Sequence, residues 1–180
     1  MELDFTEEQK LLKNTVERTC IKYSDLKSLR EIEDSEKGYS EDFWNQLINL
    51  GLTGIGIPSK YGGSNMGLLD HVIVYEEFGK SLSLSPHFIS SVICASLIQK
   101  LGSKDQKSEI LNDIASGKSI LTLAWLEEGS GFDKNGINTA LLEKNNSLLL
   151  NGIKHMVPYA SSAQKMIVLF KYKNNIGGAI

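Results

Sequence analysis

The sequence predicts an α+β protein in which an all-helical domain is followed by part of an antiparallel β-sheet or β-barrel domain. Apolar residues recur at helical spacing through the first two thirds of the 180-residue chain, between recognisable helix-capping signals. From Ser119 onward the apolar residues instead follow a period of about two, which is typical of strands. We therefore expect two domains, formed by residues 1–118 and 119–180.

Capping signals and glycines divide the helical region into segments. Thr6 opens the sequence TEEQ, in which Gln9 can close a capping box, and Leu12, Val16 and Cys20 then share one face of a helix. The same kind of evidence predicts further helices, separated by a glycine-rich connector over 51–67, at residues 40–50, 68–84, 86–101 and 103–116.

Strand patterns follow, at residues 119–125, 137–143, 147–153 and 165–173. The sequence Lys144-Asn145-Asn146 favours a hairpin turn between the second and third of them. So few strands would leave open sheet edges and a half-covered core. We therefore expect this chain to be truncated, and the segments that complete the sheet to follow Ile180.

Composition argues against several classes of function. The net charge of −3 gives no electrostatic basis for binding nucleic acid or an anionic membrane. No apolar run approaches the ~20 residues of a membrane span, and the acidic N-terminus does not resemble a signal peptide. Cys20 and Cys94 lie in apolar helical patterns without metal-ligand spacing. We expect a cytoplasmic protein with two reduced core cysteines and no metal site.

One short stretch, LTLAWLEEGSGFD at residues 121–133, joins a buried-strand pattern to a turn that contains Gly129 and Gly131. Taken alone, it fits a surface turn in which Glu127 and Glu128 are solvated. It also fits a backbone that a flat or anionic ligand approaches, because glycine has no Cβ to hold the ligand off and adopts unusual dihedrals. The surrounding motifs favour the second interpretation.

Several motifs occur in the order found in one enzyme family. The chain contains GSKDQ before a helix that ends in ASGK, then the stretch at 121–133, then LLLNGIKHMVPYA at 148–160. This series resembles the flavin-dependent acyl-CoA dehydrogenases, which have a helical first domain, a middle β-domain and a helical third domain. The family's counterparts of the two later motifs are A-L-T-E-P-x-A-G-S-D and L-N-G-x-K-x-W-I-T-N. The resemblance covers essentially the whole chain.

The resemblance implies FAD binding and α,β-dehydrogenation of an acyl-CoA thioester, with electrons passed to an electron-transfer flavoprotein. It places the substrate at Phe132 and Asp133. It places the cofactor along the two motifs, at Leu123, Ala124, Trp125, Leu126, Glu127, Gly129, Ser130, Gly131, Phe132, Met156, Val157 and Pro158. In most members the glutamate base lies in the third domain, so we assign no catalytic residue in this chain and expect the base beyond Ile180. The full-length protein is expected to form a homo- or hetero-oligomer.

Four positions depart from the family's pattern at flavin contacts. Leu126 and Phe132 stand where the first motif has Thr and Ser, and Met156 and Pro158 stand where the second has Trp and Thr. None of the four carries a hydroxyl, and proline also lacks an N–H. Tyr159 is the nearest hydroxyl to the second motif. Two functions stay open: a catalytic chain that binds FAD, and a non-catalytic, flavin-poor scaffold subunit of a heteromeric acyl-CoA dehydrogenase.

Structural or surface roles are expected for the remaining side chains of chemical interest. Glu76 and Glu77 fall on a helix of the first domain, where a structural or exposed carboxylate is the commoner case. The three histidines, His71, His87 and His155, have no partners at ligand spacing. Trp44 and Trp125 lie on apolar faces, and we expect both in the core.

Overall fold

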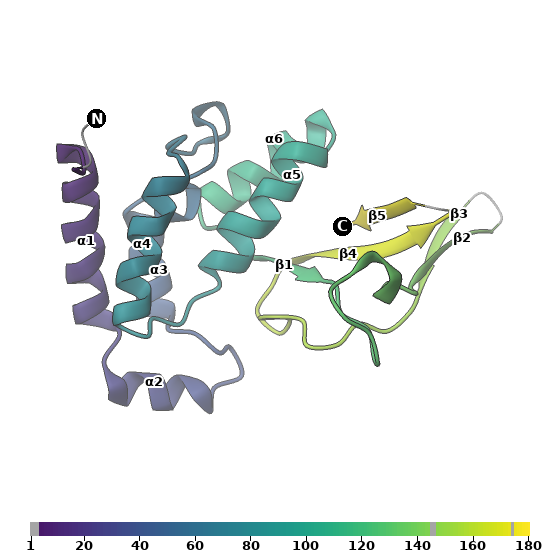
Figure 1. Cartoon of the computed structure of the whole chain (residues 1–180), viewed down its shortest axis with the longest axis horizontal. Helices are drawn as coiled ribbons and strands as arrows, with labels where there is room; N and C mark the ends of the chain where they lie inside the picture. Colours follow the sequence, from purple (N-terminus) through teal and green to yellow (C-terminus); the bar gives the residue numbers. More distant parts are fainter. Residues whose placement is uncertain (1–3, 145–146, 174) are drawn as a thin grey trace. The chain divides into compact units, whose positions relative to one another are not determined.

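The computed structural model describes residues 4–144, 147–173 and 175–180. They divide into two compact units, Met1–Ser119 and Ile120–Ile180. The first is helical and the second is built on a sheet (Figure 1). The expected fold class is therefore confirmed: a helical N-terminal part followed by a small sheet.

The helical unit consists of α-helices joined by short 3₁₀ and π-helical turns (Figure 1). The α-helices are α1 (Glu7–Tyr23), α2 (Leu26–Glu33), α3 (Glu41–Asn49), α4 (Leu68–Lys80), α5 (Ala95–Leu101) and α6 (Lys104–Ala115). The shorter turns are η1 (Leu52–Gly54), η2 (Ser59–Tyr61) and the π-helix η3 (Phe88–Cys94). Helix α1 packs alongside α4.

Three helices begin at the caps that the sequence predicts. The Thr6 and Ser103 side chains each accept a hydrogen bond from a glutamine N–H three residues later, at 3.2 Å, and both complete a capping box. Ser40 Oγ accepts from Phe43 N–H at 3.2 Å. Beyond α3, Gly51 takes φ +71°, a left-handed conformation in which glycine is at ease.

Three parts of the helical unit differ from expectation. The helix predicted over 68–84 is shorter, because α4 ends at Lys80 and Leu82 takes φ +51°. Helix α2 was not predicted; Asp25 caps it by accepting from the N–H groups of Lys27 and Ser28. The predicted helix over 86–101 is also not uniform, because it starts as the π-helix η3 and becomes α-helical only at Ala95. A π-helical turn is rare and often accompanies a local functional or packing demand.

The second unit contains β1 (Leu121–Ala124), η4 (Lys134–Gly136), β2 (Ala140–Lys144), β3 (Ser147–Asn151), β4 (Lys165–Tyr172) and β5 (Asn175–Ala179). The strand order is β1-β4-β2-β3, and β5 pairs with β4. Pairings β2–β3 and β4–β5 are antiparallel, but β4 runs parallel to β1 and β2. The sheet is therefore mixed, which corrects the expectation of purely antiparallel pairing.

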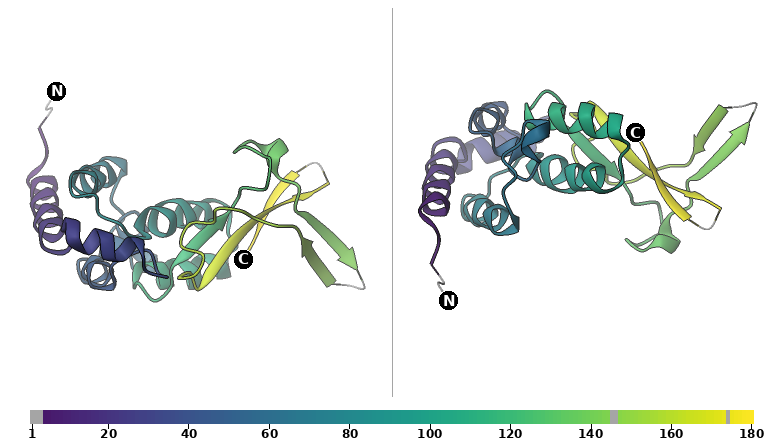
Figure 2. Two further views of the ribbon diagram at one scale, coloured as in Figure 1. Left: turned by 90° about the horizontal axis from the view of Figure 1, so that it is seen from below. Right: turned by 90° about the horizontal axis from the view of Figure 1, so that it is seen from above.

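The parallel pairing of β4 follows from the way the chain connects the strands. A long connection leads from β1 to β4, so β4 can return in the same direction as β1, and the β2–β3 hairpin is formed within that connection. Pairing of Lys144 with Ser147 confirms the hairpin, whereas Asn145 and Asn146 of its predicted turn lie outside the described residues. Figure 2 shows β4 and β5 as a twisted ribbon, with the β2–β3 hairpin extending away from it.

Each unit has its own buried residues. Phe43, Leu47, Ile73 and Leu111 are at most 1% exposed in the helical unit, and Cys20 and Cys94 are fully buried free thiols there, as predicted. In the second unit the buried apolar side chains are Ile120, Leu121, Leu123, Ala124, Ile137 and Ile167. Every residue of β3 is exposed. Trp44 is core as predicted, but Trp125 is only partly buried, which corrects that expectation.

Candidate functional site

The two sequence motifs lie side by side in the sheet unit. His155 N–H donates to the Leu126 carbonyl at 2.8 Å, the Thr122 hydroxyl donates to the Pro158 carbonyl, and Gln164 N–H donates to the Ile120 carbonyl at 3.0 Å. The segment before β4 therefore runs antiparallel along β1 and the residues that follow it. Backbone carbonyls accept all of these bonds, so the pairing does not depend on the side chains of Leu126 or Pro158.

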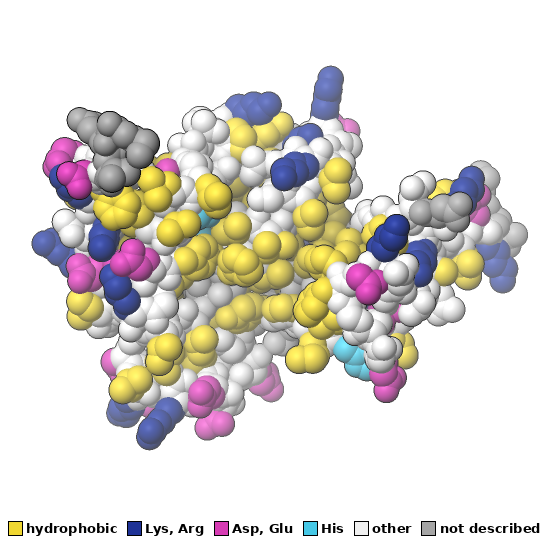
Figure 3. Space-filling model, in the orientation of Figure 1, with side chains coloured by type: hydrophobic (Ala, Val, Ile, Leu, Met, Phe, Trp, Pro, Cys, Tyr) yellow, Lys and Arg dark blue, Asp and Glu magenta, His cyan; other side chains and the backbone are white. Residues whose placement is uncertain are grey.

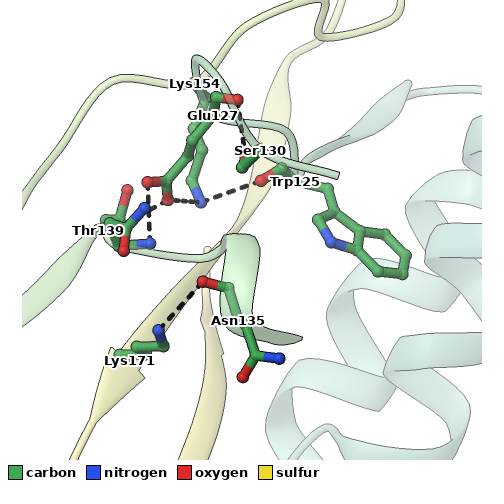
Figure 4. Close-up of polar contacts among 8 residues, drawn as sticks. Trp125, Glu127, Ser130, Asn135, Thr139, Lys154 and Lys171 are labelled. Atoms are coloured by element: carbon green, nitrogen blue, oxygen red, sulfur yellow. Dashed lines mark hydrogen bonds and ion pairs between the residues drawn. The ribbon is translucent and has the colours of Figure 1, made fainter. Parts of the chain in front are cut away.

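A buried ion pair joins the motifs at the same place. Lys154 Nζ lies 2.7 Å from Glu127 Oε1, and each side chain is only 8% exposed (Figure 4). Lys154 also donates to the Trp125 carbonyl at 3.2 Å. The Glu127 carboxylate accepts two more bonds, from Asn138 N–H at 2.8 Å and Thr139 N–H at 2.9 Å. The pair thus ties together the end of β1, the segment that enters β2 and the second motif.

This arrangement determines the charge of Glu127. Burial alone would raise the pKa of Glu127, but the hydrogen bonds from Lys154 and from the two backbone N–H groups outweigh it and hold the pKa at about 2. Glu127 is therefore an ion-paired carboxylate at neutral pH and a very weak base. Solvation of Glu127, as in a simple surface turn, is not what the structure shows, although Glu128 is exposed.

The glycine turn contains two glycines that differ in backbone conformation, although a Cβ built on either would meet no atom within 4 Å. Gly129 takes φ +70°, so a side chain there would be strained. Gly131 has no left-handed φ, and a Cβ built on it would meet no atom within 4 Å. Between them, Ser130 Oγ donates to the Glu127 carbonyl at 2.7 Å and closes the turn. The fold explains glycine at 129 but not at 131, where open space adjoins the backbone.

The two predicted substrate residues, Phe132 and Asp133, follow this turn and make different contacts. The Phe132 ring is 68% exposed and makes an edge contact with Trp125, at 5.7 Å between centroids and 83° between planes. Asp133 caps η4, where its Oδ1 accepts from Asn135 N–H and Gly136 N–H. The Asp133 carboxylate therefore has a structural task. The buried Nε1–H of Trp125 has no hydrogen-bond partner among the described residues.

The remaining predicted cofactor residues contribute mainly backbone or exposed surface. Leu123 and Ala124 are buried in β1 and paired with Ile167 and Val168 of β4. In the second motif, Met156 is 87% exposed and takes φ +49°, an uncommon conformation for a residue with a side chain. Val157 is partly buried and Pro158 is exposed. Burial raises the pKa of Tyr159, so its hydroxyl stays protonated at neutral pH.

The carboxylates of α4 are held by lysines. Glu77 is buried, and its carboxylate lies 2.8 Å from Lys80 Nζ and 3.9 Å from Lys13 Nζ, while Glu76 pairs with the same two lysines. They bridge α1 and α4, which gives both a structural role. In the described parts of the chain, no cluster of His, Cys, Asp and Glu is arranged to hold a metal ion.

His87 is a fully buried polar residue of the helical unit. Its Nε2 lies 2.9 Å from the Leu52 carbonyl, an acceptor, so Nε2 carries the proton and Nδ1 accepts from the Tyr75 hydroxyl at 2.6 Å. Burial lowers the pKa of His87 to about 4, although the bond to Leu52 opposes this shift. His87 is thus a neutral packing residue rather than a ligand.

The helical unit also carries a shallow apolar depression. Hydrophobic side chains gather over the middle of this unit in Figure 3. A pocket of about 510 Å³ is lined by Leu68, His71, Val72, Tyr75, Glu76, Phe88 and Val92.

None of the described helices is long and apolar enough to cross a membrane.

Comparison with known proteins gives a consistent family. Residues 6–118 match the family described as "Acyl-CoA dehydrogenase, N-terminal domain". Mitochondrial isovaleryl-CoA dehydrogenase from Pongo abelii is 33% identical over 171 residues, which cover 92% of this chain and 40% of that protein. The caffeyl-CoA reductase-Etf complex subunit CarC from Acetobacterium woodii is 26% identical over 169 residues, covering 93% of this chain and 44% of that subunit.

Solved structures agree. The structure of a variant of Tcur3481-Tcur3483, a steroid ACAD, matches with a TM-score of 0.86 at 26% identity, and the match covers 96% of this chain and 47% of that one. The chain thus spans less than half the length of each of these relatives.

Proposed function

Because the chain belongs to the acyl-CoA dehydrogenase family, we propose that it supplies the helical domain and part of the flavin-binding surface of an acyl-CoA dehydrogenase. Such an enzyme is an oxidoreductase that forms a double bond between Cα and Cβ of an acyl-CoA thioester. FAD, when bound, would accept the hydride that leaves Cβ. This chain's own residues would hold the flavin in position and keep water from it.

The observation that carries the proposal is the backbone contact between the two motifs. Leu126 and His155 are joined through main-chain atoms, and Lys154 binds both the Trp125 carbonyl and Glu127. A surface built from main-chain groups tolerates substitution of the side chains that it carries. The arrangement therefore supports a flavin site despite the departures at Leu126 and Pro158.

Local features fit a flat ligand beside this surface. The backbone at Gly131 adjoins open space that one Cβ would begin to fill. Met156 presents its thioether at 87% exposure from a left-handed residue, and backbone strain of this kind is frequent at ligand sites. Gly131 and Met156, with the main chain of residues 125–127, are the groups we propose to hold FAD.

The missing hydroxyls have an energetic consequence. Leu126 and Pro158 cannot donate the side-chain hydrogen bonds that threonine would supply, and each lost bond costs about 1 kcal/mol. Two such losses weaken flavin binding by roughly 30-fold. We therefore propose FAD as the cofactor, with an affinity below that of a chain that keeps both threonines.

Four carboxylates of this chain are held in structural contacts and are poor candidates for removing the α-proton. The Glu127 carboxylate is bound to Lys154 and two N–H groups, and that of Asp133 caps η4. Glu76 and Glu77 are paired with lysines. These carboxylates are already committed to structural contacts, so we propose none of them as the base.

Flavin titration tests the proposal. The purified chain is mixed with FAD, and binding is followed by the visible flavin absorption and by flavin fluorescence. We expect saturable binding, and tighter binding in the double variant Leu126→Thr/Pro158→Thr, by roughly 30-fold. Saturable binding that the double variant does not improve would place the flavin elsewhere, while lack of binding by both proteins would contradict the flavin site.

A second function is favoured by the same substitutions. A non-catalytic scaffold subunit would keep the fold and lose flavin contacts, and Leu126 and Pro158 lack the hydroxyls of the family's threonines at these positions. One solved relative is named for two proteins together, Tcur3481-Tcur3483, and CarC is named as a subunit of a complex with Etf. We accordingly propose a hetero-oligomeric setting and electron-transfer flavoprotein as partner. Lack of flavin binding by both proteins in the titration would favour the scaffold.

A further inference from the structure

Phe132 is largely exposed to solvent. It lies one residue after Gly131 in the glycine turn, at 68% exposure, while its neighbour Trp125 is partly buried. Covering an exposed apolar side chain with a ligand lowers the free energy, because the water in contact with it is released. The exposure is also paired with open space, since a Cβ on Gly131 would meet no atom within 4 Å.

The ring is held in place by a contact that leaves it accessible. Phe132 and Trp125 meet at 83° with centroids 5.7 Å apart. In such a contact the edge of one ring meets the face of the other, so Trp125 leaves at least one face of the phenyl ring uncovered. Trp125 is itself anchored, because its carbonyl accepts from Lys154 Nζ, and Figure 4 shows its indole directed away from that polar cluster.

We propose that Phe132 is a flavin-binding residue whose exposed face stacks on the isoalloxazine ring. The inference rests on the proposed function and deepens it, because it names the group that offsets the hydroxyls missing at Leu126 and Pro158. A flat ring is the ligand that a phenyl face recognises. Adenine and an aromatic acyl group share that chemistry, so the experiment must separate three planar rings.

The test compares wild type with Phe132→Leu and Phe132→Tyr. Leucine keeps an apolar side chain but has no ring, and tyrosine restores the ring. The matched control is Phe88→Leu, because Phe88 is also exposed, at 55%, and also makes an edge contact with another aromatic ring, that of Tyr75 at 5.5 Å and 89°. Thermal unfolding of each variant checks that the fold is kept.

Binding of FAD and of FMN is followed by the change in visible flavin absorption, which responds to a ring stacked on the isoalloxazine. We expect Phe132→Leu to bind both flavins about two- to tenfold more weakly and with a smaller absorption change, Phe132→Tyr to match wild type, and Phe88→Leu to be unchanged. FMN lacks adenine, so a loss confined to FAD would assign the phenyl ring to adenine and overturn the inference.

Two further arms add cinnamoyl-CoA or butyryl-CoA to the flavin-bound chain. If Phe132→Leu weakened the binding of cinnamoyl-CoA but not that of butyryl-CoA or of the flavins, the phenyl ring would be assigned to the acyl group, and the inference would be overturned. Equal flavin affinity and an equal absorption change in wild type and Phe132→Leu would also overturn it, while the proposed function would stand. Lack of flavin binding by wild type would instead contradict the flavin site of the proposed function, and this inference with it.

Discussion

At the scale of single residues, the two glycines of the glycine turn have different roles: the backbone conformation requires Gly129, and we propose that Gly131 leaves room for the ligand. Gly129 and Gly131 are both exposed, but only Gly129 has a left-handed φ, and neither position is crowded. We expect Gly129→Ala to lower the free energy of unfolding by about 1 kcal/mol. Gly131→Ala should leave stability unchanged or slightly higher, and weaken FAD binding about tenfold because the new methyl group enters the ligand's space.

Urea unfolding and flavin titration of both variants measure these effects. The two substitutions add the same atoms two residues apart, so each serves as the control for the other. If both variants lost flavin affinity equally and neither changed in stability, the prediction that Gly129 serves the fold and Gly131 the ligand would be contradicted.

The Glu127–Lys154 pair is the other residue-scale feature with a measurable consequence. We expect Lys154→Met to lower the free energy of unfolding by about 3 kcal/mol, because it leaves a buried carboxylate without its cation. Lys37→Met, which removes an exposed lysine paired with Glu41, should have no measurable effect. Urea unfolding at neutral pH compares the two; a Lys154→Met protein as stable as wild type would contradict the buried pair.

The same pair has a pH dependence of defined sign. The pKa of Glu127 lies at about 2 in the folded protein and near its ordinary value of 4.5 in the unfolded chain. The unfolded chain therefore binds more protons between these values, so the stabilisation is complete above pH 4.5 and is lost as the pH falls towards 2. In Lys154→Met this acid-dependent loss should shrink.

At the scale of elements, a neutral histidine joins α4 to the start of η3. His87 has a folded pKa of about 4, below its ordinary 6.5, so the unfolded chain takes up a proton first as the pH falls. The stability of the helical unit should therefore be full above pH 6.5 and decline by up to about 3 kcal/mol towards pH 4. Thermal unfolding across this range should show the decline in wild type.

Two variants test that assignment. His87→Gln removes the titrating group, and should abolish most of the decline between pH 6.5 and 4. His155→Gln changes an exposed histidine, and this variant should show the same decline in stability as wild type. If both variants declined like wild type, a group other than His87 would control the stability in this range.

Sequence patterns predicted the elements whose causes are local. The caps at Thr6, Ser40 and Ser103 depend on residues three positions apart, so their helices were predictable. The strand β5 (Asn175–Ala179) contains two adjacent glycines and gives no strand signal of its own; it exists because β4 offers a partner edge. The parallel pairing of β1 with β4 likewise joins residues far apart in the chain.

In the candidate site, too, features with local causes could be predicted and pairings between distant residues could not. Both motifs were visible in the sequence, and Glu127 and Lys154 each match a motif position, but their pairing could not be predicted because 27 residues separate them. The buried, ion-paired state of Glu127 was missed for that reason. The capping role of Asp133 had a local signal, since Asp followed by Lys-Asn-Gly commonly forms a side-chain-capped turn.

At the scale of the whole molecule, the two units differ in how completely their elements are buried. Val16 and Cys20 in α1 are 0% exposed, and Ile167 in β4 is 4% exposed, whereas all of β3 is exposed and lies next to β2 at one end of the strand order. An element with few buried contacts opens locally at low free-energy cost. We therefore expect the amides of β3 to exchange with deuterium at least about a hundredfold faster than those of α1 and of Ile167.

Amide hydrogen exchange followed by NMR or mass spectrometry provides this comparison. Ile167 is the internal control, because it lies in the same sheet as β3 but is buried; its slow exchange would show that burial rather than membership of the sheet unit sets the rate. Exchange in β3 as slow as at Ile167 would mean that the sheet opens as one cooperative unit. Fast exchange confined to β3 would instead leave β1 and its backbone contacts with the second motif intact, as the proposed flavin surface requires.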